Sequence, residues 1–340
     1  MAVALTICFS LGVAGTAAAS GKHHGSRGVP DQQISIQLWT FSQYIGFGTD
    51  AATIARTEEV FGKLRSYGYR NVEPFTLSGL TAAQYRALLD KYGLKASARH
   101  VDVGTPEKPA NIDQIIADNK TLGIKYFGSG ATPIFPPIYT TEAQWVAYAK
   151  YLNEVGAKAR QAGQRLMVHN HDIEFSTKFG NRTVFDILMA NTDPRNVVFQ
   201  LDLYWVTAGG ADPVAVLKRY GKRIQLFHVK DMKGSDRSIE IVGRGIINFP
   251  KIFAAGKNIR YYVVEHDPPQ NNPNFDPFEA AKVGFDYLDH VRFRSHRGHH
   301  KAHKGHHEGH KGHHKGHGRG HDKGHGRGHD KSHGRGHDRD

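Results

Sequence analysis

The chain has 340 residues, with 45 Lys and Arg against 32 Asp and Glu, 23 His and a single Cys, so it is long enough for a large buried core in one or two domains. Only +6 of the formal net charge of +13 precedes Arg294, which does not favour a nucleic-acid-binding core. After the N-terminus no apolar run approaches the roughly 18 to 20 residues that span a bilayer, so no membrane span is expected.

Residues 1–19 are predicted to be a signal peptide. The stretch is apolar and ends in small residues, with Ala17 and Ala19 in the arrangement that signal peptidases cleave. No Lys or Arg precedes it, so the alternative is a buried N-terminal helix or a misplaced start codon. Export to the periplasm or the medium is expected, with a flexible lead over 20–30. Cys8 lies in the signal, so the mature chain would form no disulfide.

Residues 294–340 contain 15 His, 12 Gly and 12 Lys and Arg, with almost no apolar side chain. Such a segment cannot bury enough surface to fold, so we predict a disordered tail. Histidines every three to four residues would bind Zn²⁺, Ni²⁺ or Cu²⁺ loosely. Binding of polyanions through the tail's net charge of +7 is the alternative, and a tail of little consequence is a third possibility.

Between Asp31 and Phe293, helical patterns alternate with short apolar runs, which indicates βα units and a parallel sheet. Most runs follow a glycine that ends a helical pattern, as in LDKYGLKASARH. Eight such units in about 260 residues are typical of a (β/α)8 TIM barrel, an α/β fold. The predicted strands are Ile34–Trp39, Arg70–Glu73, Lys95–His100, Tyr126–Gly128, Arg165–His169, Val197–Asp202, Ile224–His228 and Tyr261–Glu265.

Six of these predicted strands end in an ionisable residue. The six are Glu73, His100, His169, Asp202, His228 and Glu265. A barrel places its active site at the carboxyl ends of its strands. Several carboxylates and imidazoles there, with no thiolate, suit a divalent cation such as Mn²⁺, Mg²⁺ or Zn²⁺ with open positions for a substrate. A metal of this kind would polarise a carbonyl and assist removal of a neighbouring proton.

Seven stretches of the sequence resemble the sugar isomerase and epimerase family of xylose isomerase-like TIM barrels, a fold shared with AP endonucleases. They are GYRNVEPF, ASARHVD, MVHNHDIEF, FQLDLYWV, LFHVKDM, VGRGIINFPKIF and YYVVEHD. The resemblance covers nearly all of residues 31–293. The 26 residues between Asp202 and His228 also match the spacing of those ligands in the family.

The resemblance implies four metal ligands at strand ends, which fall on the MVHNH strand, Asp202, His228 and Glu265. The first differs from the family, because His169 stands where the epimerases have Glu. Either His169 replaces that carboxylate, which we favour, or the loop returns Glu174 to the metal. Loss of the glutamate removes one of two acid/base carboxylates, which makes a lyase, dehydratase or keto-sugar reaction more plausible than simple epimerisation.

The remaining candidate residues flank the same strand ends. Lys230 should point the same way as His228 and could hold a substrate oxygen or act as an acid, together with Glu174 and Glu265 as catalytic groups. Glu73 and His100 are expected to contact substrate. Trp39 and Trp205 could form an apolar wall against a sugar ring, although ordinary barrel packing would explain them as well.

The sequence therefore predicts a metal-dependent isomerase, epimerase or lyase that acts on a sugar, cyclitol or keto-sugar by proton abstraction beside a carbonyl. One alternative is an inactive barrel that binds metal or sugar, with the tail as its working part. A phosphodiesterase of the AP-endonuclease kind is disfavoured, because its multi-metal cluster needs more ligands and this core offers little attraction for DNA phosphates.

Overall fold

The structure is a computed structural model that describes residues 28–131, 139–269 and 275–293. The predicted signal peptide at 1–19 and the predicted tail at 294–340 lie outside the described residues, and so does the lead up to residue 27. Within the described ranges, no helix is both long and apolar enough to cross a membrane.

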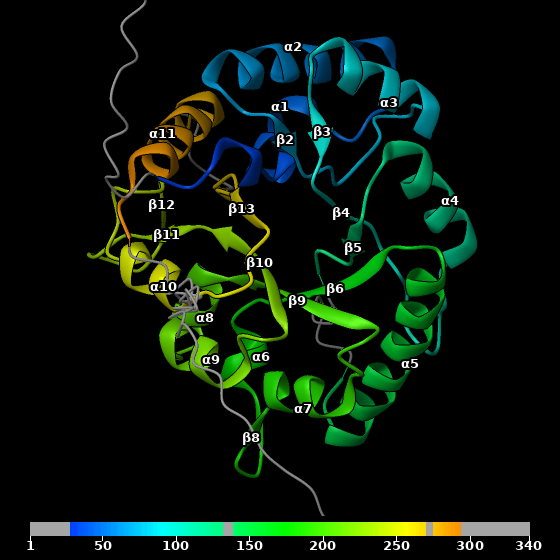
Figure 1. Ribbon diagram of the computed structural model, residues 1–340, viewed down its shortest axis with the longest axis vertical. Coiled ribbons are helices and arrows are strands. Elements are labelled where there is room, and N and C mark those ends of the chain that lie inside the picture. The colour runs from blue at the N-terminus through cyan, green and yellow to red at the C-terminus, as the bar shows by residue number, and fades with distance from the viewer. Residues whose placement is uncertain (1–27, 132–138, 270–274, 294–340) are drawn as a thin grey trace, which may run out of the picture. The chain divides into compact units, whose positions relative to one another are not determined.

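A parallel sheet of seven strands forms most of a barrel (Figure 1). All of its neighbouring strands pair in parallel. In spatial order the strands are β1 (Ile34–Ile36), β13 (Tyr261–Val264), β10 (Ile224–Val229), β9 (Val197–Asp202), β6 (Arg165–His169), β5 (Tyr126–Gly128) and β4 (Ala98–His100).

Two short strands close the barrel between β4 and β1. β2 (Asn71–Val72) pairs with β3 (Lys95–Ala96), and β3 continues into β4 after Ser97. On the other side of β2, Glu73 N donates to Ile36 O over 2.7 Å and Leu38 N donates to Glu73 O over 3.0 Å. The eight predicted strands are therefore present, the third of them in two parts, and the predicted TIM barrel is confirmed.

Helices surround the sheet in chain order (Figure 1). The eight that cover it are α2 (Ala51–Tyr67), α3 (Ala82–Lys91), α4 (Ile112–Leu122), α5 (Glu142–Gln161), α7 (Val184–Asn191), α9 (Pro213–Tyr220), α10 (Phe249–Ala255) and α11 (Pro277–His290). Capping boxes start three of them, at Thr81, Thr141 and Thr183. Gly68 and Gly123 end α2 and α4 in the left-handed conformation, as the glycine stops predicted.

The loops after the strands contain short elements that the sequence did not predict. They are η2 (Leu38–Phe41), α1 (Ser42–Ile45), α6 (Ile173–Ser176), α8 (Leu203–Ala208), the hairpin β7 (Lys178–Phe179) with β8 (Arg182–Thr183), and the hairpin β11 (Asp231–Met232) with β12 (Ile239–Glu240); η1 (Asp31–Gln33) precedes β1. The predicted extension of the first strand to Trp39 is wrong. Gln37 Oε1 accepts from Trp39 N over 3.1 Å, and this bond starts the turn of η2.

The buried carboxylate of Asp231 fixes the loop that follows this last hairpin. It accepts from the backbone amides of four residues, over 2.8 to 3.1 Å: Met232, Gly243, Gly245 and Ile247. Gly245 passes so close that a Cβ atom there would lie 2.4 Å from Asp231 Oδ1. The loop beside the barrel mouth is therefore shaped around one side chain, which follows directly after Lys230.

We expect Asp231→Ala to lower the free energy of unfolding by about 2–4 kcal/mol, because four backbone amides, one buried and three partly buried, lose their acceptor. Urea unfolding measures the change, and Asp236→Ala, at an exposed position of the same hairpin, is the control. Equal stability of the two variants would show that water replaces the Asp231 carboxylate without cost.

Candidate active site

Two layers of side chains fill the barrel along its strands. One buried apolar cluster contains one residue from each of five neighbouring strands: Ala98, Tyr126, Met167, Val198 and Leu226. Side chains two residues further along a strand point to the same face. That rule places His100, His169, Gln200 and His228 above the apolar layer, at the carboxyl ends of their strands. Because strand side chains alternate, these four residues lie at the same level of the barrel and form one polar layer.

Glu73 is the central acceptor of this polar layer. Its Oε1 accepts from Gln37 Nε2 over 2.7 Å and lies 2.8 Å from His228 Nε2 and 3.0 Å from His100 Nε2. Its Oε2 accepts from Gln200 Nε2 over 2.8 Å. The carboxylate has no solvent exposure, so these four groups provide its solvation.

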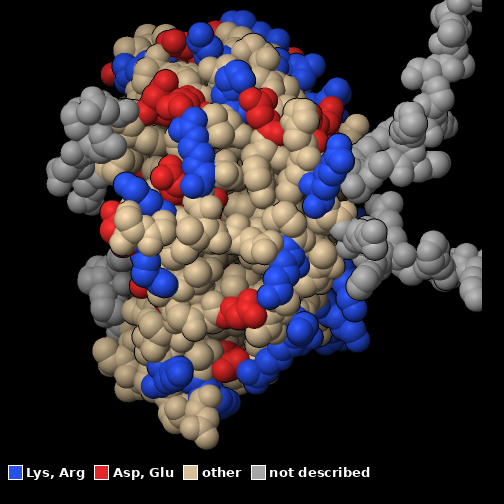
Figure 2. Space-filling view, turned by 90° about the vertical axis from the view of Figure 1, so that its left-hand side faces the viewer, with Lys and Arg blue, Asp and Glu red and all other residues tan. Residues whose placement is uncertain are grey.

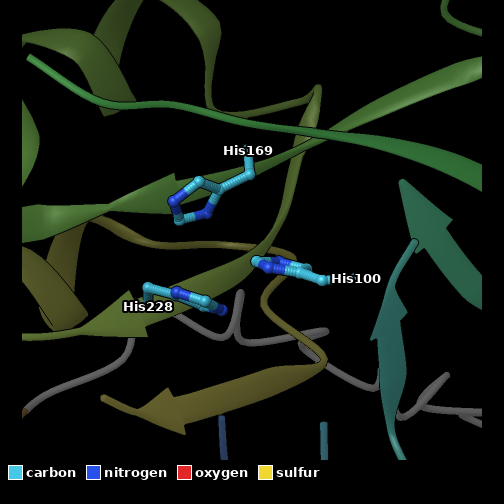
Figure 3. A group of neighbouring side chains, drawn as sticks. All are labelled: His100, His169 and His228. Carbon is cyan, nitrogen blue, oxygen red and sulfur yellow. The ribbon is translucent and has the colours of Figure 1, made fainter. Parts of the chain in front are cut away.

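The rings of three histidines, His100, His169 and His228, lie close together (Figure 3), and two of them, His100 and His228, contact Glu73. The ring centroids of His169 and His228 are 4.6 Å apart, and that of His100 lies 5.0 and 5.2 Å from them. Gln200 Oε1 lies 2.8 Å from His100 Nε2 and 3.1 Å from His169 Nδ1, which orients both rings. A Cβ at Gly130 would come within 2.4 Å of His100 Nδ1, so the ring lies against bare backbone.

Lys230 lies among three carboxylates. Its Nζ is 2.8 Å from Glu265 Oε2, 2.9 Å from Asp267 Oδ2 and 3.2 Å from Asp202 Oδ2. His228 Nδ1 approaches the same group, 2.7 Å from Glu265 Oε2 and 4.0 Å from Asp202 Oδ2. His228 therefore faces Glu73 with one ring nitrogen and the carboxylates around Lys230 with the other.

These contacts shift the pKa values of the histidines in opposite directions. Burial would lower the pKa of His228, but the charges and hydrogen bonds of Glu265 and Glu73 outweigh it and raise the pKa to about 10. Burial, with the neighbouring His228 and His100, holds the pKa of His169 well below its usual value. Burial and Lys230 lower the pKa of His171 to about 3. One imidazole is thus held charged and two are held neutral.

The carboxylates show an excess of negative charge. Burial raises the pKa of Asp202 to about 6, although Lys230 opposes it, and burial also raises the pKa of Asp267. Four carboxylates, Glu73, Asp202, Glu265 and Asp267, face two cations, Lys230 and His228. The buried carboxylates therefore outnumber the cations that face them.

A divalent cation fits this deficit. Asp202 Oδ2 is buried and accepts no hydrogen bond, although Lys230 Nζ lies 3.2 Å away. One ligand atom each from Asp202, His228 and Glu265 lie within 4.8 Å of one another. Two carboxylates with one imidazole suit a metal such as Mn²⁺ or Zn²⁺. The same 4.8 Å limit also holds for His100, His169 and His228. A divalent metal therefore matches the donors, and their types do not fix its identity.

A cavity of about 1010 Å³ opens over these groups, lined among others by His100, His169, His171, Lys230, Glu265 and Asp267. Trp39 and Trp205 line it as well, so both predicted aromatic residues reach the mouth. Glu174 is placed differently. It is buried, it does not line this cavity, and its Oε2 accepts from His171 N over 2.9 Å.

Sequence reasoning missed Gln37, Gln200 and Asp267. Gln200 precedes Asp202 by two residues on β9 and Gln37 follows the inward Ser35 by two, so strand periodicity could have found both. Asp267 lies two residues after Glu265 in the same way. The strand-end pattern selects ionisable side chains, so it does not point to the amides of Gln37 and Gln200 or to Asp267 beyond the end of its strand.

The sequence profile of the xylose isomerase-like TIM barrel family matches residues 61–274. The chain belongs to this family. Its curated relatives include inosose dehydratases from Clostridium tetani, 30% identical over 179 residues (46% of this chain and 59% of that protein), and from Lacticaseibacillus casei, 28% identical over 171 residues (44% and 55%). The matched part spans little more than half the length of these relatives.

Solved structures support the same fold. A sugar phosphate isomerase/epimerase from Parabacteroides distasonis aligns with a TM-score of 0.63 at 23% identity, over 82% of this chain and 98% of that one. The IOLI protein, described with a bound zinc atom, aligns with a TM-score of 0.54 at 15% identity, over 75% and 95%. At this identity the likeness concerns the fold alone.

In the metal-free protein, we expect Glu73→Gln to cost about 3–5 kcal/mol of unfolding free energy, because the buried His228 cation loses one of its two carboxylate partners and keeps only Glu265 on the other nitrogen. The cost depends on pH. The Glu73 carboxylate contributes its full stabilisation of the folded state above its usual pKa of 4.5, and this stabilisation is lost as pH falls toward its folded-state pKa of about 2. The charged His228 imidazole contributes its full stabilisation below its usual pKa of 6.5, and this stabilisation is lost as pH rises toward its folded-state pKa of about 10. The loss is therefore greatest between pH 4.5 and 6.5.

Urea unfolding of the metal-free proteins across pH 4 to pH 10, roughly the interval between these pKa values, measures this profile. Glu279→Gln is the control, since that carboxylate is half exposed in its pair with Arg244. A loss that does not vary with pH would contradict the charge pairing of Glu73 with His228.

Proposed function

We propose that this chain is a divalent-metal-dependent dehydratase of a keto-cyclitol or keto-sugar. The observation that carries the proposal is the Lys230 ammonium, held 2.8 Å from Glu265 and 2.9 Å from Asp267 in the wall of the cavity. This ion-paired group places a proton donor and a proton acceptor beside the candidate metal ligands. The inosose dehydratases among the relatives support the same class of reaction.

The proposed metal ligands are Asp202, His228 through Nδ1, Glu265 and His169. Bound there, a divalent cation would polarise a substrate carbonyl and stabilise negative charge on its oxygen. Glu73 would hold His228 by its other nitrogen, at 2.8 Å, and so keep Nδ1 directed at the carboxylates. Glu73 and His100, predicted as substrate contacts, take the role of orienting groups in this proposal, although His100 also lines the cavity.

The proton transfers are assigned to Asp267 and Lys230. Asp267 takes the proton from the carbon next to the carbonyl, the C–H electron pair forms the new double bond, and the neighbouring C–O bond breaks. Lys230 gives a proton to the departing hydroxyl, which leaves as water. The proton on Asp267 then returns to Lys230 across their 2.9 Å contact, which restores both groups. Glu174, predicted for acid/base work, holds the backbone of His171 in this scheme.

Two other readings remain alternatives. An epimerase or isomerase would use the same groups but return the proton to carbon without loss of water. A barrel without turnover would bind metal or sugar only. On the sequence alone, we also propose export through residues 1–19 and loose binding of metals by the histidines of 294–340.

We expect the full chain to bind one equivalent of Mn²⁺, Zn²⁺ or Mg²⁺ more than its Asp202→Asn variant, since that variant removes a ligand and a negative charge from the site. Elemental analysis after passage over a chelating resin measures the difference, and metal on the tail is common to both proteins. Asp113→Asn, with its side chain 79% exposed, is the control. Equal metal content in all three proteins would overturn the barrel site.

We expect Lys230→Met to bind the metal at least as tightly as the parent chain, because the variant removes a cation that competes for Asp202 and Glu265. Dehydration of inosose should fall about 10²-fold to 10⁴-fold with loss of the general acid. Lys233→Met, at an exposed position nearby, should change neither property.

Inosose supplied in deuterated water separates the three readings. Loss of water from the ring supports the dehydratase, and deuterium incorporation without loss of water supports the epimerase. If neither is observed, the hypothesis of a binding protein without turnover is left. Full activity in Lys230→Met would remove Lys230 from the mechanism.

A further inference from the structure

Three aromatic side chains form a group at the edge of the cavity, which we call the aromatic rim: Trp39 on η2, Phe47 after α1 and Phe75 after β2. The ring centroids of Trp39 and Phe75 are 5.2 Å apart, and Phe47 lies 5.8 Å from each of them. Their edge-on and tilted contacts are those of a stable aromatic cluster. All three rings line the cavity that contains Lys230 and Glu265.

Two side chains of the aromatic rim are exposed to solvent, unlike the apolar side chains of the core. Phe47 is 69% exposed and Trp39 is 38% exposed, whereas Phe41 and Ile45 in the same segment are 0% and 1% exposed. The segment therefore packs against the core through buried side chains such as Phe41 and Ile45, and the core does not need its two exposed ones, Trp39 and Phe47. Exposed aromatic side chains that share a cavity with a reaction site are typical of ligand contacts.

The size of the cavity points the same way. At about 1010 Å³ it lies at the upper end of the range, roughly 300–1,000 Å³, of pockets that enclose drug-sized ligands. One six-membered ring held by the metal ligands and Lys230 would leave much of this volume to water. Trp205 already lies beside Lys230, with its ring 5.3 Å from Nζ, so the reacting ring has an apolar neighbour without the rim.

We propose that the aromatic rim is a binding subsite for a second ring with an apolar face, attached to the sugar or cyclitol that reacts. The substrate is then a ring-substituted keto-sugar, carrying an aryl group or a further sugar unit, instead of a free monocyclic compound. This inference rests on the proposed function for the reacting ring, and on the rim and the cavity for the second one.

Ring-bearing ligands fit the rim for a physical reason. Aryl rings pack against aromatic side chains with about 0.5–1.5 kcal/mol beyond the area they bury, and the C–H faces of sugar rings make similar apolar contacts. Ser42 and Gln43 line the cavity beside the rim and provide polar partners for hydroxyl groups. The subsite thus offers both kinds of contact that a substituted sugar presents.

Binding of three probes to the full chain in the presence of Mn²⁺ tests the subsite by titration calorimetry: methyl β-D-glucopyranoside, phenyl β-D-glucopyranoside and cellobiose. We expect phenyl glucoside or cellobiose to bind about threefold to tenfold more tightly than methyl glucoside. Phe47→Ala and Trp39→Ala should each remove this preference, and Phe47→Ala should leave the affinity for methyl glucoside unchanged. Ile246→Ala is the matched control, because Ile246 is 60% exposed and does not line the cavity.

A stronger preference for phenyl glucoside would identify the second ring as an aryl group, and one for cellobiose would identify it as a sugar. Equal binding of the three probes, no binding of any, or a preference that survives both substitutions would overturn the subsite. The readout does not depend on turnover. If the two-ring probes bind more tightly but inosose is not dehydrated, the dehydratase proposal is overturned and the aromatic-rim subsite stands. If inosose is dehydrated but the probes bind equally, the subsite is overturned and the dehydratase proposal stands.

Discussion

The ionised carboxylate of Glu73, sealed inside the barrel, is the constraint on which the mouth depends. The backbone of Glu73 closes the barrel between β1 and β2, and its carboxylate contacts side chains of β4, β9 and β10. Burial opposes its charge, yet the neighbouring His100 and His228 lower its pKa to about 2. Three strands are therefore tied to one side chain that is stable only when each of its donors is in place.

His228 links Glu73 to the candidate metal ligands. One nitrogen is held by Glu73, so the other is fixed toward Asp202 and Glu265 without a metal being needed to orient it. Lys230 then reduces the repulsion among the buried carboxylates, although burial and, after it, the charge of Glu265 still raise the pKa of Asp202 to about 6. A site of this kind is preorganised for a cation but also competes with it through an internal ammonium.

The sequence predicted the barrel well because its signals are local: glycine stops, strand periodicity and ionisable residues at strand ends. It predicted that Glu73, His100, His169, Asp202, His228 and Glu265 lie together at the carboxyl ends of the strands, and the structure brings them into one connected group. It did not predict the hydrogen bonds that side chains make to the backbone or to distant strands. Gln37 ends the first strand early, Glu174 binds the amide of His171, and Gln200 joins His100 to His169. None of these choices follows from periodicity or composition.

The backbone at Gly130 carries a consequence for variation of the protein. A methyl group there would fall 2.4 Å from the ring of His100, so every other amino acid would force that imidazole out of its contact with Gln200 and Glu73. Position 130 thus controls the polar layer without contributing an atom to its hydrogen bonds. Random mutagenesis would find it as intolerant as a ligand, and a comparison of related sequences should find glycine at 130 wherever histidine stands at 100.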